Sequence, residues 1–177
     1  LKEVAARGYE YDSSTFPATP YYLAKSAVMG GLAVLGRPST AILDSPRVLL
    51  APRAPYRPSI EAPYRRGRAD LVELPVAVAP VTRLPFIGTF VTTMPWGLIE
   101  LTFRTLRREV LFNFELHALD VLDDTDGVPP ELVRQQIDLR VQARIKLARL
   151  AKLLAWLGAD RDRVTLLDAA RRLRPLV

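Results

Sequence analysis

The alternation of apolar and polar positions along the chain predicts helices and short strands in turn. Residues 1–7 have helical spacing and end at Gly8, and residues 9–12 alternate as a short strand does. A long apolar helix should follow from Pro20 to Gly36. Further strands are expected at 48–50, 71–76, 85–93, 109–116 and 163–165. Further helices are expected at 95–108, at 141–157 and after residue 165.

This order of elements is typical of an α/β fold with a mostly parallel, curved sheet, such as part of a (β/α) barrel. The hydrophobic content of 49% is that of a globular protein, so we expect a single domain over residues 1–177. Prolines and arginines concentrate at about 37–68, which predicts a surface excursion there. Because the chain begins inside a helix without Met, we expect it to be a portion of a longer protein.

Two of the expected helices have distinct apolar patterns. The helix from Pro20 to Gly36 is interrupted by Lys25 and is shorter than the roughly 20 residues that a bilayer span needs, so we expect it to be buried or interfacial. On the helix at 141–157, one face should pack inward through Ala143, Leu147, Leu150, Leu154 and Leu157. The last helix of the chain has a separate signal, because Thr165 and Asp168 have the spacing of a capping box at its start.

The composition excludes several kinds of site. The chain has no Cys and one His, so it cannot by itself form a thiolate site or a site with two imidazoles. No Gly-rich phosphate loop and no serine-nucleophile elbow occurs. Arginine supplies 21 of the 25 basic residues, and the net charge is +6. The arginines are scattered without a nucleic-acid-reading motif, so we expect no nucleic-acid partner, whereas contact with an anionic membrane surface is compatible with them.

His117 is the strongest candidate for chemistry. It follows the expected strand at 109–116, and the carboxyl edge of a parallel sheet is where α/β proteins place their sites. Imidazole is the side chain whose unperturbed pKa allows proton transfer near neutral pH. A structural role for a lone histidine, with one hydrogen-bond partner in the interior, is the alternative.

Polar residues that could accompany His117 follow the first strand. Asp12, Ser13 and Ser14 would lie at the same sheet edge, where a carboxylate could fix the imidazole tautomer. The alternative is that these residues cap a local turn. The sequence does not decide whether Glu73 faces the site or solvent. The acidic segment Asp120 to Asp126 lacks the spacing of a calcium loop, so we expect a solvated loop rather than a metal site.

Several of these segments together resemble the polysaccharide deacetylases. The resemblance is carried by the stretch ending in Tyr11-Asp12-Ser13-Ser14, by residues 71–76 and 84–89, and by Leu116-His117 with the long helix that follows. It spans nearly the whole chain and matches the carboxyl-terminal half of that family. It implies a distorted (β/α) barrel that uses a divalent metal, commonly zinc, to remove acyl groups from amino sugars.

The resemblance also implies roles for individual residues. By position, His117 would be the acid that protonates the departing amine, and Asp12, Ser13 and Ser14 would bind substrate. The family's base and metal ligands lie in an aspartate-pair motif and in a motif with two histidines, and this chain has neither. We therefore expect no metal bound by this chain alone, and an inactive fragment of an enzyme whose substrate is an amino sugar, either polymeric or lipid-linked. A catalytically silent glycan-binding relative is the alternative. Oligomeric state and localisation are not predicted.

Overall fold

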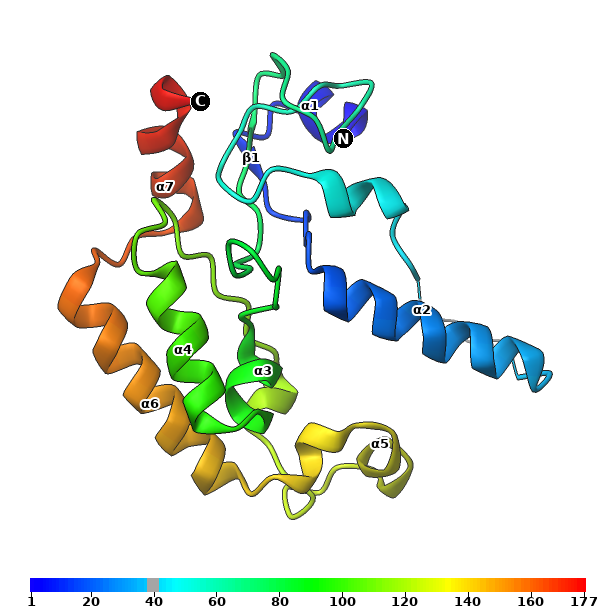
Figure 1. The fold of residues 1–177 in the computed structure, drawn as a ribbon. Helices are drawn as coiled ribbons and strands as arrows, with labels where there is room; N and C mark the ends of the chain where they lie inside the picture. The colour runs from blue at the N-terminus through cyan, green and yellow to red at the C-terminus, as the bar shows by residue number, and fades with distance from the viewer. Residues whose placement is uncertain (38–41) are drawn as a thin grey trace. The chain divides into compact units, whose positions relative to one another are not determined.

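The fold is described from a computed structural model that covers residues 1–37 and 42–177 (Figure 1). Part of the expected excursion at 37–68, namely residues 38–41, lies outside the described residues. The chain forms two compact units. The first consists of Leu1–Pro85, Glu109–Asn113 and Thr165–Val177, and the second of Phe86–Arg108 and Phe114–Val164.

The expected barrel sheet is wrong. The protein is 49% helical, and the sheet of the described residues has two strands, β1 (Tyr11–Asp12) and β2 (Val72–Glu73). They pair in parallel, with Tyr11 opposite Val72 and Asp12 opposite Glu73. Pro75, Pro80 and Pro85 follow β2, and prolines remove the backbone donors that a longer ladder would need.

The expected strand before His117 does not form either. Residues 109–116 are irregular, and they take part in separate backbone hydrogen bonds rather than in a ladder. Asn113 accepts one from the Ala77 N–H at 2.9 Å, and Glu115 accepts one from the Gly88 N–H at 2.8 Å. Residues 163–165 are also irregular, and residues 48–50 lie in the 3₁₀ helix η1 (Pro46–Leu50). The strand expected at 109–116 is therefore wrong, because an alternating run does not by itself provide a strand partner.

Besides η1, the described residues of the first unit form further helices. These are α1 (Lys2–Ala6), α2 (Thr19–Val34) and α7 (Leu166–Leu173), followed by the short 3₁₀ helix η4 (Arg174–Leu176). The predicted ends are confirmed where the signal is local, because Gly8 and Gly36 have φ of 75° and 69°, and Thr165 Oγ1 accepts the Asp168 N–H at 3.1 Å. The core packs α7 onto the strand pair through Val72, Leu74, Ala169, Ala170 and Leu173.

The second unit is helical. It contains α3 (Gly88–Thr93), α4 (Trp96–Leu106), α5 (Pro130–Gln135) and α6 (Ala143–Asp160), with the 3₁₀ helices η2 (Ala118–Asp120) and η3 (Ile137–Arg140). The expected extended segment at 85–93 is wrong, because Thr92 and Thr93 donate their hydroxyls to the Thr89 carbonyl and α3 buries Phe90 and Val91. The helix α3 packs against α6.

The inward face of α6 differs from the expected one. Leu147 and Leu154 are half-exposed, whereas Lys146, Leu150 and Leu153 are buried. The Lys146 ammonium donates to the carbonyls of Leu119 (2.9 Å) and Leu122 (2.6 Å). A buried ammonium is tolerated only where such acceptors are available. The carbonyls of the loop after His117 therefore allow the face of α6 that carries Lys146 to point inward.

Candidate functional site

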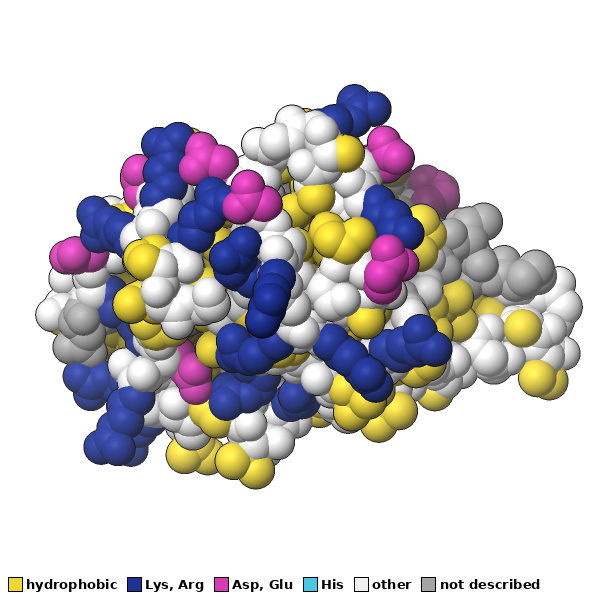
Figure 2. Space-filling view, turned by 90° about the horizontal axis from the view of Figure 1, so that it is seen from above, with side chains coloured by type: hydrophobic (Ala, Val, Ile, Leu, Met, Phe, Trp, Pro, Cys, Tyr) yellow, Lys and Arg dark blue, Asp and Glu magenta, His cyan; other side chains and the backbone are white. Residues whose placement is uncertain are grey.

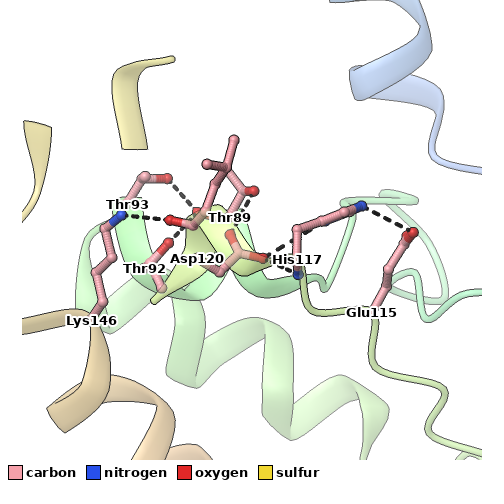
Figure 3. Close-up of polar contacts among 8 residues, drawn as sticks. Thr89, Thr92, Thr93, Glu115, His117, Asp120 and Lys146 are labelled. Atoms are coloured by element: carbon pink, nitrogen blue, oxygen red, sulfur yellow. Dashed lines mark hydrogen bonds and ion pairs between the residues drawn. The ribbon is translucent and has the colours of Figure 1, made fainter. Parts of the chain in front are cut away.

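His117 lies at the start of η2 with its imidazole more than half exposed (Figure 3). Two carboxylates flank the ring. Nε2 is 3.4 Å from Glu115 Oε1, and Nδ1 is 3.8 Å from Asp120 Oδ2. The imidazole therefore combines solvent access with a carboxylate on each side. This is an arrangement suited to a proton donor rather than to a buried structural histidine.

Of the two carboxylates beside His117, that of Asp120 is held in place by the protein interior. Its side chain is fully buried, and its two oxygens accept hydrogen bonds from Thr89 Oγ1 at 2.9 Å and from the His117 N–H at 2.8 Å. A buried carboxylate needs such donors. Because α3 supplies Thr89 and the turn supplies His117, the carboxylate fastens the histidine turn to α3 (Figure 3).

Gly88 makes room for this carboxylate. A Cβ atom added at Gly88 would lie 2.1 Å from Asp120 Oδ2 and 2.8 Å from a methyl group of Leu116. No side chain can occupy that space without displacing Asp120, so glycine is required by the close approach of α3 to the turn. The Gly88 N–H also donates to the Glu115 carbonyl, which ties both sides of His117 to the same helix end.

The acidic segment after His117 is a capping structure. Asp123 is buried, and its carboxylate accepts from the Ala143 N–H at 2.7 Å and from the Thr125 N–H and hydroxyl at 2.8 and 2.6 Å. These hydrogen bonds lower the pKa of Asp123 to about 2. The expected solvated loop is correct for the exposed Asp124 but wrong for the buried Asp120 and Asp123. Asp123 fixes the start of α6.

In the first unit, Asp12, Ser13 and Ser14 follow β1 and already have partners. The Asp12 carboxylate accepts from the Ser13 N–H at 2.9 Å and from the Ser14 hydroxyl at 3.0 Å. Ser13 Oγ donates to the Leu74 carbonyl, and the Asn113 amide donates to the same two oxygens at 2.8 Å. This is a local turn tied to β2. Substrate binding by Asp12, Ser13 and Ser14 stays a prediction.

Glu73 is a buried carboxyl group, which the sequence left undecided. It is 2% exposed, and Oε1 accepts the Thr15 N–H at 3.0 Å. Removal from solvent is the main cause that raises its pKa to about 7, and the nearby Asp12 raises it further. Burial likewise raises the pKa of Tyr56, whose backbone pairs with Glu73, to about 12. The parallel register that sets Asp12 opposite Glu73 explains why two acidic groups meet here.

The structure thus places the predicted residues in two separate groups. Asp12, Ser13 and Ser14 belong to the first unit and His117 to the second. The carboxylate that orients His117 is Asp120, which the sequence analysis had assigned to the acidic loop. The spacing of His117 and Asp120, three residues apart at the start of a helical turn, is the signal that could have identified it.

The resemblance implies a divalent metal, and its ligands would have to come from His, Cys, Asp or Glu side chains. Among the residues that the structure describes, no group of three or more His, Cys, Asp or Glu side chains could hold a metal ion. Comparisons of the chain with protein-family models, with curated proteins and with solved structures found no match.

Proposed function

We propose that this chain carries the general acid of a carbohydrate deacetylase, with His117 protonating the amine that leaves when an N-acyl group is hydrolysed from an amino sugar. The observation that carries the proposal is the half-exposed imidazole of His117 held against the buried carboxylate of Asp120. The resemblance of the surrounding sequence to polysaccharide deacetylases supports the same role.

The two nitrogens of the His117 ring have different roles in this proposal. In this proposal Nε2 donates the proton to the leaving amine, and Nδ1 lies 3.8 Å from Asp120 Oδ2. When the amide C–N bond breaks, the nitrogen takes the Nε2 proton and leaves as an amine. The hydroxyl of water remains on the acyl carbon, and the other proton of that water is released to solvent. His117 becomes neutral and recovers a proton from solvent, to which it is open.

The described residues of this chain provide the acid but no group that could hold a metal ion. Activation of the attacking water must therefore come from groups outside these residues in the complete protein. A catalytically silent glycan-binding protein is the second candidate, and the missing metal-binding group is the observation that favours it.

Replacement of His117 by Ala in the complete protein tests the proposal. Release of acetate from N-acetylglucosamine oligomers should fall by about a hundredfold, the usual contribution of a positioned general acid. Asp124→Asn, a change at an exposed acidic residue of the same segment, should leave turnover as it is. Unchanged turnover in His117→Ala contradicts the acid role. If no acetate is released by the unaltered protein although it binds the oligomers, the silent glycan-binding candidate is correct.

A further inference from the structure

The helix α2 is apolar, and none of its residues is fully buried. Of its 16 residues only Lys25 is charged, and none is buried by the described parts of the chain. Large apolar side chains are exposed along it and just after it, namely Tyr21, Leu23, Val28, Val34 and Leu35. A helix that is apolar on all sides is normally buried, and continuous exposed apolar surface marks a contact with a partner or a membrane. The surface of α2 is therefore incomplete without an occupant.

The length of α2 limits the form of that contact. At 1.5 Å per residue, 16 residues extend about 24 Å, less than the roughly 30 Å of a bilayer core. None of the helices described is long and apolar enough to cross a membrane. In a bilayer, α2 would therefore lie within the interfacial layer of one leaflet.

Basic residues border the apolar stretch. Lys25 and Arg37 flank the eleven uncharged residues 26–36. The Lys25 ammonium lies 5.9 Å from the centre of the Tyr21 ring, and no ion pair of Lys25 or Arg37 occurs among the described residues. Long basic side chains at the ends of an apolar helix can reach the headgroups while the helix lies deeper.

A cavity of about 490 Å³ lies in the same unit as α2, and two arginines line it. Arg47, Tyr64 and Arg65 line it together with Leu50 and Glu61. Asp44 connects the cavity to α2, because its carbonyl accepts the Tyr22 hydroxyl at 3.0 Å and its carboxylate accepts the Tyr64 hydroxyl. Glu61 is paired with Lys2 at 3.0 Å, whereas Arg47 and Arg65 have no acidic partner among the described residues.

We infer that α2 and the cavity form a docking surface for an anionic lipid bilayer, with α2 in the interfacial layer and Arg47 and Arg65 on lipid phosphates. The guanidinium group binds phosphate through paired hydrogen bonds. This surface complements a bilayer in polarity and in charge. Its apolar side chains can contact the acyl region, and its cations can contact the headgroups. Figure 2 shows how Lys and Arg side chains are spread over one face of the molecule.

Charge disfavours a second copy of the chain as the occupant. In a two-fold symmetric dimer the same patch would face itself. Lys25, Arg37, Arg47 and Arg65 of both copies would then be brought together, and these cations outnumber the carboxylates of Asp44 and Glu61 in the same surface. The net charge of the protein is already +6. The inference does not depend on the proposed deacetylase function.

Vesicle flotation of the full chain tests this surface. The chain should float with phosphatidylcholine vesicles that contain phosphatidylglycerol and remain at the bottom with phosphatidylcholine alone. The double change Arg47→Gln and Arg65→Gln should weaken binding by roughly thirtyfold, the effect of two basic residues at an anionic surface. Arg7→Gln with Arg68→Gln removes the same charge from positions that line neither α2 nor the cavity, and should weaken binding much less.

The apolar contribution is tested separately. Val28→Asp with Val34→Asp should abolish flotation while the helical circular dichroism and melting temperature stay unchanged, because neither side chain is buried. Failure of the unaltered chain to float with anionic vesicles overturns the inference. So does equal weakening by both arginine pairs, which indicates attraction by net charge only. Formation of a dimer that Val28→Asp disrupts would identify a second copy as the occupant instead.

Discussion

Oδ2 of Asp120 lies 3.8 Å from Nδ1 of His117 and accepts a 2.8 Å hydrogen bond from the backbone N–H of the same residue. One buried oxygen therefore fixes the histidine backbone and faces its ring. The second oxygen is held by Thr89 on α3. A side chain that is exposed to solvent is in this way positioned from the interior, which is the usual construction of a reactive group on a rigid support.

If His117 is the general acid, Asp120→Asn should lower kcat by about tenfold or more with little change in KM, because a positioning residue acts on the reacting group and not on substrate binding. Steady-state kinetics of the complete protein, with Asp124→Asn as the matched control, measure this effect. A purely structural role of Asp120 would lower the melting temperature of the variant and leave kcat per folded molecule unchanged, which contradicts the positioning role.

Gly88→Ala should destabilise the protein by about 1–3 kcal/mol, because the new methyl group overlaps the Asp120 carboxylate. Gly97→Ala is the matched control, since no atom lies within 4 Å of its added Cβ and alanine favours the α4 helix. Urea denaturation of both variants measures the difference. Equal stabilities of the two variants would show that the Asp120 carboxylate moves aside without cost.

Stability should fall as pH rises through the titration of Glu73. Its pKa is raised from 4.5 in the unfolded chain to about 7 in the folded one, so its contribution is fully present below about pH 4.5 and lost by about pH 7. Since one pKa unit corresponds to about 1.4 kcal/mol, the loss is about 3 kcal/mol at most.

Glu73→Gln should remove this part of the pH dependence and stabilise the protein at neutral pH, because glutamine keeps an acceptor for the Thr15 N–H without a charge. The free energy of unfolding by urea, measured across that pH range, checks the prediction. Glu61→Gln, at an exposed carboxylate, should leave the dependence as it is. If the free energy of unfolding of both variants changes with pH in the same way, Glu73 is not a buried ionisable group.

Asp123 should have the opposite pH dependence. Its folded pKa is lowered from 3.8 to about 2, so the stability that it contributes is present above pH 3.8 and is lost as pH falls towards 2. Asp123→Ala removes the acceptor at the start of α6 and should lower the melting temperature at neutral pH by several degrees. Asp124→Ala should leave the melting temperature unchanged. Thermal melts of the two variants at neutral and acidic pH measure the difference.

Features that depend on neighbouring residues were predictable from the sequence. The ends of α1 and α2 at Gly8 and Gly36, and the Thr165 cap of α7, are confirmed. The identity of His117 as the chain's only imidazole was also available from the sequence. Its orienting partner was not, because the burial of Asp120 depends on the approach of α3, and residues 85–93 had been predicted as extended chain.

The sequence by itself determined the ends of α1 and α2, the cap of α7, the apolar nature of α2 and the scarcity of metal ligands, because these depend on local backbone preference and on composition. Only the tertiary structure decided that residues 109–116 lack a strand partner, that Lys146 points inward, and that Glu73 and Asp120 are buried. Strand formation and burial depend on which distant segments meet, since a hydrogen-bond ladder and removal from water both need a second surface. That information is not contained in the spacing of residues along one segment.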